Sequence, residues 1–168
     1  MNRYTVAILV KNQFGVLNRL TSMFRRRQFN INSLTASETE SSDYSRITFS
    51  FDGEEENKKQ LINQLYKLPD VCSIKELSDE NSVKCELMMI KMKNSSSTRP
   101  DIYAAAEAFS AETIDYSRDS FVLRLIGQGS KLDDFITLMK DFEILEICRT
   151  GTASLEKGGS VLRQAINL

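Results

Sequence analysis

The feature that most constrains the fold is an ordered set of apolar patterns that occurs twice in the 168 residues. An almost continuous apolar run at Tyr4–Val10 predicts a strand buried on both faces. Apolar residues then recur at helical spacing from Val16 to about Gln28. The remaining segments predict two strands, a helix and a strand, at residues 31–39, 47–51, 61–65 and 71–77. This β-α-β-β-α-β order is typical of a ferredoxin-like domain.

The same order follows a polar linker at Ser78–Ser82, which contains no apolar residue. The second set predicts a strand, a helix, two strands, a helix and a strand, at residues 83–93, 98–109, 113–117, 121–126, 130–139 and 144–148. From Thr150 onward, a glycine-rich tail predicts a loop and a short docking segment. We therefore expect an α+β protein with two ferredoxin-like domains in tandem, at residues 1–78 and 79–168.

Composition disfavours several classes of function. The chain has no histidine, the commonest general base and metal ligand, and its three cysteines are isolated from one another. A formal net charge of −1 favours neither nucleic acid nor an anionic membrane as a partner. Phe49 and Phe51 alternate inward, which disfavours an RNA-binding sheet, and no apolar run is long enough to span a membrane. We expect a soluble cytoplasmic protein without a metal site or catalytic residues of its own.

One candidate site is the turn between the first strand and the first helix. Asn12 and Gly15 lie in this turn, and Asn30 follows the helix. The start of a helix offers unpaired backbone N–H groups and the positive end of a dipole, which suit a carboxylate. Glycine lets a ligand approach the backbone, and asparagine amides supply donors and acceptors to a zwitterion. The alternative is that both asparagines only shape the backbone, and physical reasoning leaves both open.

Other motifs carry weaker signals. Gly127-Gln128-Gly129 precedes a helix but lacks the remaining glycine and the lysine of a phosphate-binding loop. Asp52 and Glu55 have the spacing of a helix capping box. Three arginines lie in predicted strands or directly beside them, from which they could reach anions: Arg46, Arg124 and Arg149. Sequence gives no geometry for them.

Four segments carry a more specific signal, namely Ile8–Thr35, Ser45–Thr48, Glu86–Met92 and Arg149–Gly151. Together they resemble the regulatory small subunit of acetohydroxyacid synthase, also called acetolactate synthase, over nearly the whole chain. The resemblance implies that the first domain is an ACT domain. It also implies a non-catalytic subunit that activates a catalytic large subunit carrying thiamine diphosphate, FAD and magnesium. In that family the small subunit confers feedback inhibition by valine on branched-chain amino acid biosynthesis.

The resemblance also implies an effector site. L-valine would bind between the ACT domains of two subunits, which requires at least a homodimer. The side chains of Asn12 and Asn30 would contact the amino acid. The backbone at the helix start would also contact it, at Gly15, Val16 and Leu17. Ile31 would line the apolar part of the pocket. No residue of the chain is implied to bind a metal or to act in catalysis.

Four positions depart from the family pattern. Lys11 stands where an acid is common, Phe14 replaces a proline or small residue, Gln28 replaces glycine, and Lys157 replaces arginine. These departures leave both asparagines and the turn glycine unchanged. Two alternative functions remain from the sequence: a free-standing tandem amino-acid sensor that acts on a transcriptional or other partner, and a small enzyme, for which the chain offers no evident nucleophile or base.

Overall fold

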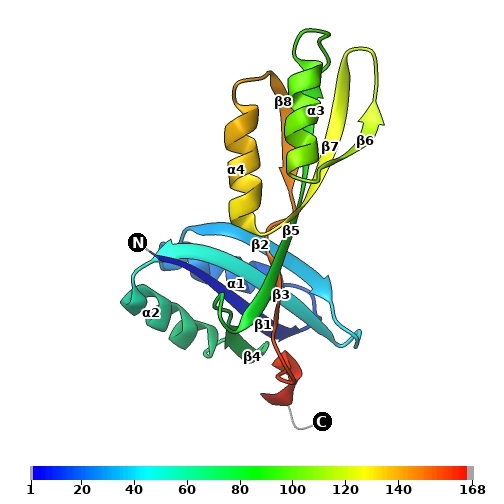
Figure 1. The fold of residues 1–168 in the computed structure, drawn as a ribbon. Helices are drawn as coiled ribbons and strands as arrows, with labels where there is room; N and C mark the ends of the chain where they lie inside the picture. The colour runs from blue at the N-terminus through cyan, green and yellow to red at the C-terminus, as the bar shows by residue number, and fades with distance from the viewer. Residues whose placement is uncertain (1, 166–168) are drawn as a thin grey trace. The chain divides into compact units, whose positions relative to one another are not determined.

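The computed structural model describes residues 2–165, and its elements follow the predicted order (Figure 1). The chain forms two compact units, residues 2–84 with 152–165, and residues 85–151. The first unit contains β1 (Asn2–Lys11), α1 (Val16–Arg26), β2 (Ile31–Glu38), β3 (Tyr44–Gly53), α2 (Glu55–Leu65), β4 (Val71–Glu76), β9 (Ala153–Glu156) and the 3-10 helix η1 (Leu162–Ala165). The second contains most of β5 (Ser82–Lys93), then α3 (Arg99–Ala108), β6 (Glu112–Tyr116), β7 (Ser120–Gly127), α4 (Gly129–Met139) and β8 (Ile144–Arg149).

The strand order of the first unit confirms the ferredoxin-like fold. Its sheet has the order β2-β3-β1-β4, and each neighbouring pair is antiparallel. Strands β1 and β2 therefore run in the same direction on either side of β3. Lys11, at the end of β1, lies opposite Tyr44, whereas Ile31, at the start of β2, lies opposite Phe51. The end of β1 and the start of β2 thus lie at opposite ends of the sheet.

Helices α1 and α2 cover one face of this sheet (Figure 1). Alternate residues of β1 point toward them, because side chains alternate between the two faces of a strand. The helices contribute Leu20, Met23, Phe24, Leu61 and Leu65 to a core shared with the sheet residues Val6, Ile8, Val10, Ile47, Phe49 and Phe51. Each of these fully buried side chains is worth about 1.5–3 kcal/mol of transfer free energy, so this face supplies most of the unit's stability.

The opposite face of β1 is buried as well. Ala7 and Leu9 point away from the two helices and pack with Leu77 and with Leu162 of η1. The prediction that this strand is buried on both faces is therefore confirmed. Its second cover comes from the C-terminal tail, more than a hundred residues further along the chain.

Three polar contacts fasten the tail to the sheet. Arg46 on β3 donates from Nη2 to the carbonyl of Ser154 at 2.6 Å. Lys75 on β4 forms an ion pair with Glu156 at 2.9 Å. Further along the tail, Arg163 pairs with Glu40, in the β2–β3 connection, at 3.2 Å.

The sequence predicts domains at residues 1–78 and 79–168, which places the tail in the second domain. In the structure, the tail belongs to the first unit. The structure assigns residues 79–84 and 152–165 to the first unit. Ser154 Oγ donates to the carbonyl of Val83 at 3.0 Å, and the Lys157 N–H donates to the carbonyl of Asn81 at 2.8 Å. The reason is that an apolar strand face needs a cover, which the polar linker cannot supply but Leu162 can.

The second unit repeats the architecture of the first. Its antiparallel strands have the order β6-β7-β5-β8, and α3 and α4 cover one face (Figure 1). The core is built from both helices and the alternate residues of β5 and β7, with Met88, Ile90, Met92, Ile102, Phe121, Leu123, Leu125, Leu132, Phe135 and Met139 fully buried. The expected pair of ferredoxin-like units is confirmed.

One predicted helix cap is wrong. Residue Glu54 is the N-cap of α2, and no side chain caps this helix. Asp52 instead accepts hydrogen bonds from Arg3 at 3.0 Å and from Asn32 at 2.6 Å, so it joins three strands rather than starting a helix with Glu55. These cross-strand partners are far apart in sequence and leave no local signal.

The attachment of the tail should weaken in acid. Hydrogen bonds from Lys75 and then from Ser160 hold the pKa of Glu156 below its usual value. A carboxyl whose pKa is lower in the folded state stabilises that state above its unfolded pKa, about 4.3 for glutamate, and stops doing so as the pH falls through the folded value. We expect amide exchange of residues 153–163, corrected for intrinsic rates, to accelerate below about pH 4.3.

Glu156→Gln is the matched control for this pH effect. Glutamine keeps the size and an acceptor but has no proton to gain. The variant should show weaker tail protection at neutral pH and a smaller further loss in acid than the wild type, because Glu40, the partner of Arg163, still titrates. Equal acid sensitivity in both proteins would contradict the assignment to Glu156.

Candidate functional site

The predicted turn leaves β1 and enters α1 through a left-handed glycine. Gly15 has a φ of +83° and is the N-cap of α1, and no side chain caps this helix. Only glycine adopts this backbone conformation without steric cost. The first turn of α1 carries no acidic residue, in contrast to α2, which has Glu55 and Glu56 there. No residue of the first turn therefore compensates the positive end of the α1 dipole with a carboxylate.

Backbone N–H groups at this helix start are open. The Val16 N–H contacts the carbonyl of Gln13 at 3.4 Å, and the Arg19 N–H bonds to the carbonyl of Gly15 at 2.9 Å. Between them, the N–H groups of Leu17 and Asn18 find no acceptor within residues 2–165. Two adjacent donors at a positive dipole end can bind a carboxylate.

Arg19 places a guanidinium group beside the turn. Its Nη1 lies 3.3 Å from the place that a Cβ on Gly15 would occupy. The same side chain is held by Asp70, whose Oδ2 is 2.6 Å from Nε. Sequence reasoning missed this arginine, although its spacing of four from the glycine places it one helical turn above.

Asn12 is anchored to the β2–β3 connection. Its Nδ2 donates to Glu38 Oε1 at 3.1 Å and to the carbonyl of Ser42 at 2.9 Å, and its Oδ1 accepts from Ser45 Oγ at 3.1 Å. Both amide hydrogens are thus engaged, and one lone pair of the oxygen remains. Asn12 therefore shapes the backbone, which is one of the two roles that the sequence left open. Its Oδ1 can still accept one hydrogen bond from a ligand.

Asn30 has the opposite character. It is exposed, and its side-chain amide makes no hydrogen bond to the rest of the described chain. Ile31, the next residue, is half-buried against the core of the first unit. These two residues stand at the start of β2, which is an edge strand of the sheet.

The six predicted contact residues consequently form two separate groups. Asn12, Gly15, Val16 and Leu17 lie at one end of the sheet, and Asn30 and Ile31 lie at the other. The register separates these ends by the stretch of β3 from Tyr44 to Phe51, which spans roughly 23 Å at about 3.3 Å per residue. One chain cannot place both groups against one amino acid.

The departures from the family pattern are accommodated locally. Gln28 has a φ of +58°, which explains why glycine suits this position. Phe14 is fully exposed and packs against nothing in its own unit. Lys157 donates from Nζ to the carbonyls of Asp79 at 3.2 Å and Glu80 at 3.1 Å, so a single cation still binds this loop.

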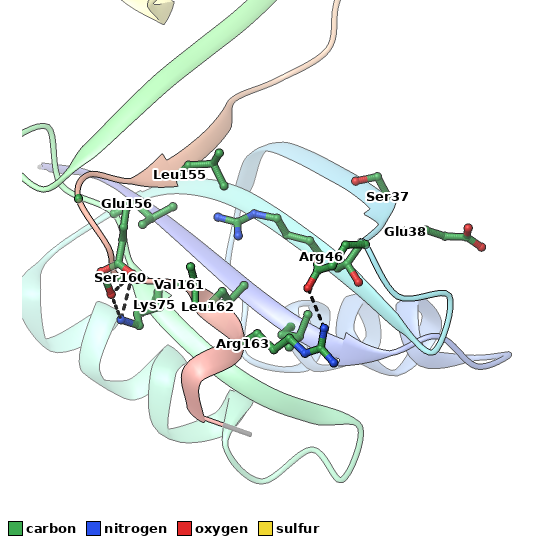
Figure 2. A pocket seen from close by; sticks show the side chains of 15 residues that line it. Ser37, Glu38, Arg46, Lys75, Leu155, Glu156, Ser160, Val161, Leu162 and Arg163 are labelled. Atoms are coloured by element: carbon green, nitrogen blue, oxygen red, sulfur yellow. Dashed lines mark hydrogen bonds and ion pairs between the residues drawn. The ribbon is translucent and has the colours of Figure 1, made fainter. Parts of the chain in front are cut away.

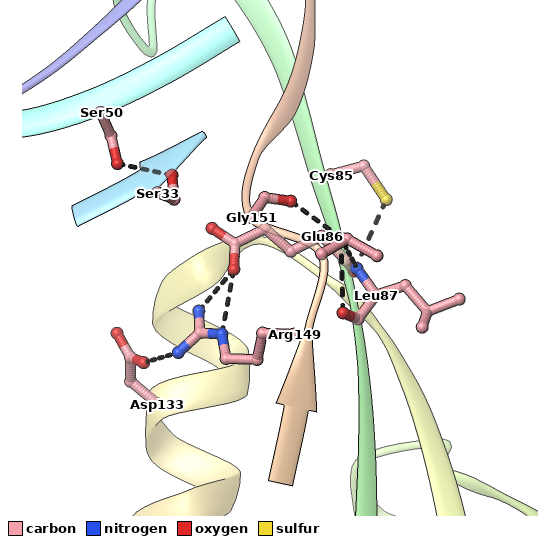
Figure 3. Close-up of polar contacts among 9 residues, drawn as sticks. Ser33, Ser50, Cys85, Glu86, Leu87, Asp133, Arg149 and Gly151 are labelled. Carbon is pink, nitrogen blue, oxygen red and sulfur yellow. Dashed lines mark hydrogen bonds and ion pairs between the residues drawn. The ribbon is translucent and has the colours of Figure 1, made fainter. Parts of the chain in front are cut away.

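The second unit contains a compact charged cluster around Arg149 (Figure 3). Arg149 contacts Glu86 Oε2 at 2.5 Å and Asp133 Oδ1 at 2.6 Å, which ties together β8, β5 and α4. Burial lowers the pKa of Arg149, but its hydrogen bonds to both carboxylates outweigh that effect and raise it. A Cβ on Gly129 would lie 3.0 Å from Glu86 Oε1, so this glycine makes room for the cluster. It therefore serves packing rather than a phosphate.

The described residues contain neither a metal-binding cluster nor a membrane-spanning helix. In that part of the chain, no group of three or more potential metal-ligating side chains is arranged around a common point. No helix within residues 2–165 has the length and apolar character needed to cross a membrane.

Comparison with known proteins agrees with this architecture. Residues 6–73 match a family model described as an AHAS small subunit-like ACT domain. Residues 85–158 match one described as the small subunit of acetolactate synthase. The first unit is thus an ACT domain, and the fold and turn define a tandem protein of the ACT-type regulatory class.

Individual relatives narrow this class. The acetolactate synthase small subunit of Bacillus subtilis is 40% identical over 91% of this chain and 90% of its own length. The isozyme 3 small subunit of Escherichia coli is 32% identical over 96% and 99%. The crystal structure of the small subunit from Thermotoga maritima matches with a TM-score of 0.86 and 30% identity, covering 95% of this chain and all of that one. The chain belongs to the family of acetolactate synthase small subunits.

Removal of the Arg149 charge should destabilise the second unit. Arg149→Met removes the ion-pair partner at 2.5 Å from Glu86, whose side chain is only 9% exposed. We expect the free energy of unfolding of the second unit to fall by about 2–3 kcal/mol. The reason is that removal of one partner of a buried ion pair leaves the desolvation cost of the remaining charge. Peptide-resolved amide exchange of residues 85–151 measures it separately from the first unit.

A second variant tests the cause. Glu86→Gln combined with Arg149→Met removes the buried charge and should recover part of the loss. Lys93→Met, which removes the exposed 3.8 Å pair with Glu143, is the control and should cost little. A double variant as unstable as Arg149→Met would contradict the charge explanation.

Proposed function

We propose that this chain is a regulatory subunit that activates a separate catalytic subunit of acetolactate synthase and makes it sensitive to valine. Membership of the small-subunit family supports the partner, and the division of the predicted contact residues into two groups supports a ligand shared between two copies. The chain itself contributes no catalytic group. Thiamine diphosphate, FAD and magnesium would reside in the catalytic partner.

The edge strand β2 supports the shared site. Asn30 directly precedes it, and Glu38, the partner of Asn12, is its last residue. Within β2 none of the residues is lysine or proline, the residues that commonly protect an edge from pairing. Antiparallel pairing of β2 with its copy about a twofold axis would bring Asn30 of one subunit beside the turn of the other. Such a dimer would have two equivalent sites.

The chemistry of the two groups fits a small aliphatic amino acid. The open N–H groups of Leu17 and Asn18, with Arg19 close by, would bind the α-carboxylate. The remaining lone pair of Asn12 Oδ1 would accept from the α-ammonium group. Asn30 from the second subunit would complete the polar contacts, with Ile31 beside the aliphatic side chain. Valine has this combination of groups.

The second unit is the natural candidate for contact with the catalytic subunit. It has its own core, and its family model is specific to acetolactate synthase small subunits. The outer face of its sheet presents partly exposed Met89 and Ile126. If these side chains belong to a contiguous apolar patch, that patch would suit a protein interface.

Reconstitution tests the proposed function directly. The purified chain alone should form no acetolactate, and it should raise the activity of a folded cognate large subunit when the two are mixed. Valine should then inhibit the complex but not the large subunit alone. Absence of stimulation would refute the regulatory role, and co-purification with an unrelated protein would favour the free-standing sensor. Stimulation without any valine effect would refute only the effector assignment.

Paired variants test whether the site is shared. Gly15→Asp places a carboxylate where the ligand carboxylate would bind, and aspartate tolerates the left-handed conformation better than most residues. Asn30→His alters the other group. Each homodimer should lose valine binding. A purified heterodimer of the two variants has one doubly altered site and one intact site, so calorimetry should find one valine per dimer.

The controls for this experiment come from the chain itself. Gly158→Asp introduces the same change at another glycine with positive φ and open surroundings, and it should keep valine binding. A heterodimer that binds no valine, while the wild type does, would show that the site lies within one chain.

A further inference from the structure

The first unit has a pocket between the outer face of its sheet and the tail, away from the turn described above. Its volume is about 490 Å³, within the range of small-molecule sites (Figure 2). β1, β2, β3, β4 and the tail segment of residues 155–163 all contribute to it. Because these elements belong to one compact unit, the pocket has a defined shape.

The floor of the pocket is apolar. Leu9 of β1, Leu77 after β4 and Leu162 of η1 are buried there, and the more exposed Leu155 and Val161 stand at its sides. A ligand that fills this space must therefore present an aliphatic part, which would displace water from these side chains.

The acidic side chains around the pocket already have partners. Glu156 is paired with Lys75 at 2.9 Å and accepts from Ser160 at 2.8 Å. Glu40 is paired with Arg163 at 3.2 Å. The third acid, Glu38, accepts from Asn12 at 3.1 Å. A cationic ligand would compete with the cations already paired with Glu156 and Glu40.

Arg46 is the exception among the charged lining residues. Its side chain extends from β3 into the pocket toward the segment that carries Leu155 (Figure 2). Within the described chain its one hydrogen bond is to the carbonyl of Ser154, and no carboxylate forms an ion pair with it. Burial lowers the pKa of its guanidinium, with Glu156 acting weakly in the opposite direction. A half-buried guanidinium without a carboxylate is costly, and an anion would relieve that cost.

We propose that this pocket binds a small aliphatic monocarboxylate, with its carboxylate on Arg46 and its alkyl chain over Leu9, Leu77 and Leu162. Of the three cations that line the pocket in the described chain, Lys75 and Arg163 are in ion pairs and Arg46 is not, so a single negative charge fits better than a phosphate dianion. The site is separate from the proposed valine site and does not depend on it. An occupant would rest against the tail as well as the sheet, so its binding would hold the tail in place.

Binding of a carboxylate series to the isolated full-length chain tests this proposal. The probes are acetate, butanoate, hexanoate and octanoate, with hexanamide as the neutral match for hexanoate. Calorimetry should show saturable binding of hexanoate and octanoate. Affinity should rise by up to about fourfold for each added methylene that the floor buries. Hexanamide should bind at least about tenfold more weakly than hexanoate, because it lacks the charge-assisted contact.

Three variants locate the ligand. Arg46→Gln keeps a donor for the Ser154 carbonyl but removes the charge, and it should weaken hexanoate binding about tenfold or more. Val161→Trp narrows the mouth from an exposed position and should weaken octanoate most. Arg124→Gln, on β7 of the second unit, removes another strand arginine and should leave binding unchanged.

Several results would overturn the proposal. No saturable binding of octanoate by the wild-type chain would overturn the proposal. So would equal affinities for hexanoate and hexanamide, or unchanged affinity in both Arg46→Gln and Val161→Trp. Valine at saturating concentration should not displace octanoate, and displacement would place the carboxylate at the α1 turn instead.

Discussion

Burial of β1 on both faces is the constraint on which the first unit depends. Val6, Ile8 and Val10 need the two helices, and the alternate residues Ala7 and Leu9 need a second cover. A ferredoxin-like domain with helices on one face cannot supply that cover from its own six elements. The tail does, and the tail's contacts follow from this need. The discontinuity of the first unit and the pocket under the tail therefore have one physical origin.

The strand register explains why a regulatory site would require two subunits. Within one sheet, the turn before α1 and the start of β2 are held apart by most of the length of β3. Neither group alone surrounds a ligand: the first offers donors and one acceptor, and the second offers a free amide beside an apolar side chain. A twofold axis is a simple operation that brings them together. Effector binding and subunit association would then be thermodynamically linked.

Much of the fold could be predicted because it rests on local periodicity. The apolar run of β1 and the helical spacing in α1 survive in the structure with only small changes at their ends. The features that escaped prediction depend on partners distant in sequence. Asn12 bonds to Glu38 and Ser45, and neither spacing has a recognisable signature. Asp52 likewise accepts from cross-strand donors rather than capping a helix, because three charge-assisted bonds outweigh one local bond. Turn and helix-start chemistry suggested Asn12, Gly15 and Asn30, and resemblance added Val16, Leu17 and Ile31. The place of Arg19 beside the turn required coordinates.

The discontinuous first unit has a consequence for folding during synthesis. Residues 85–151 form a complete unit with its own core, and they leave the ribosome before the tail does. The first sheet, although synthesised earliest, keeps Ala7, Leu9 and Leu77 uncovered until Leu162 has emerged. The inserted unit can thus finish folding first, and the amino-terminal unit finishes last. During that interval the nascent chain presents an uncovered apolar surface, a natural binding site for a chaperone.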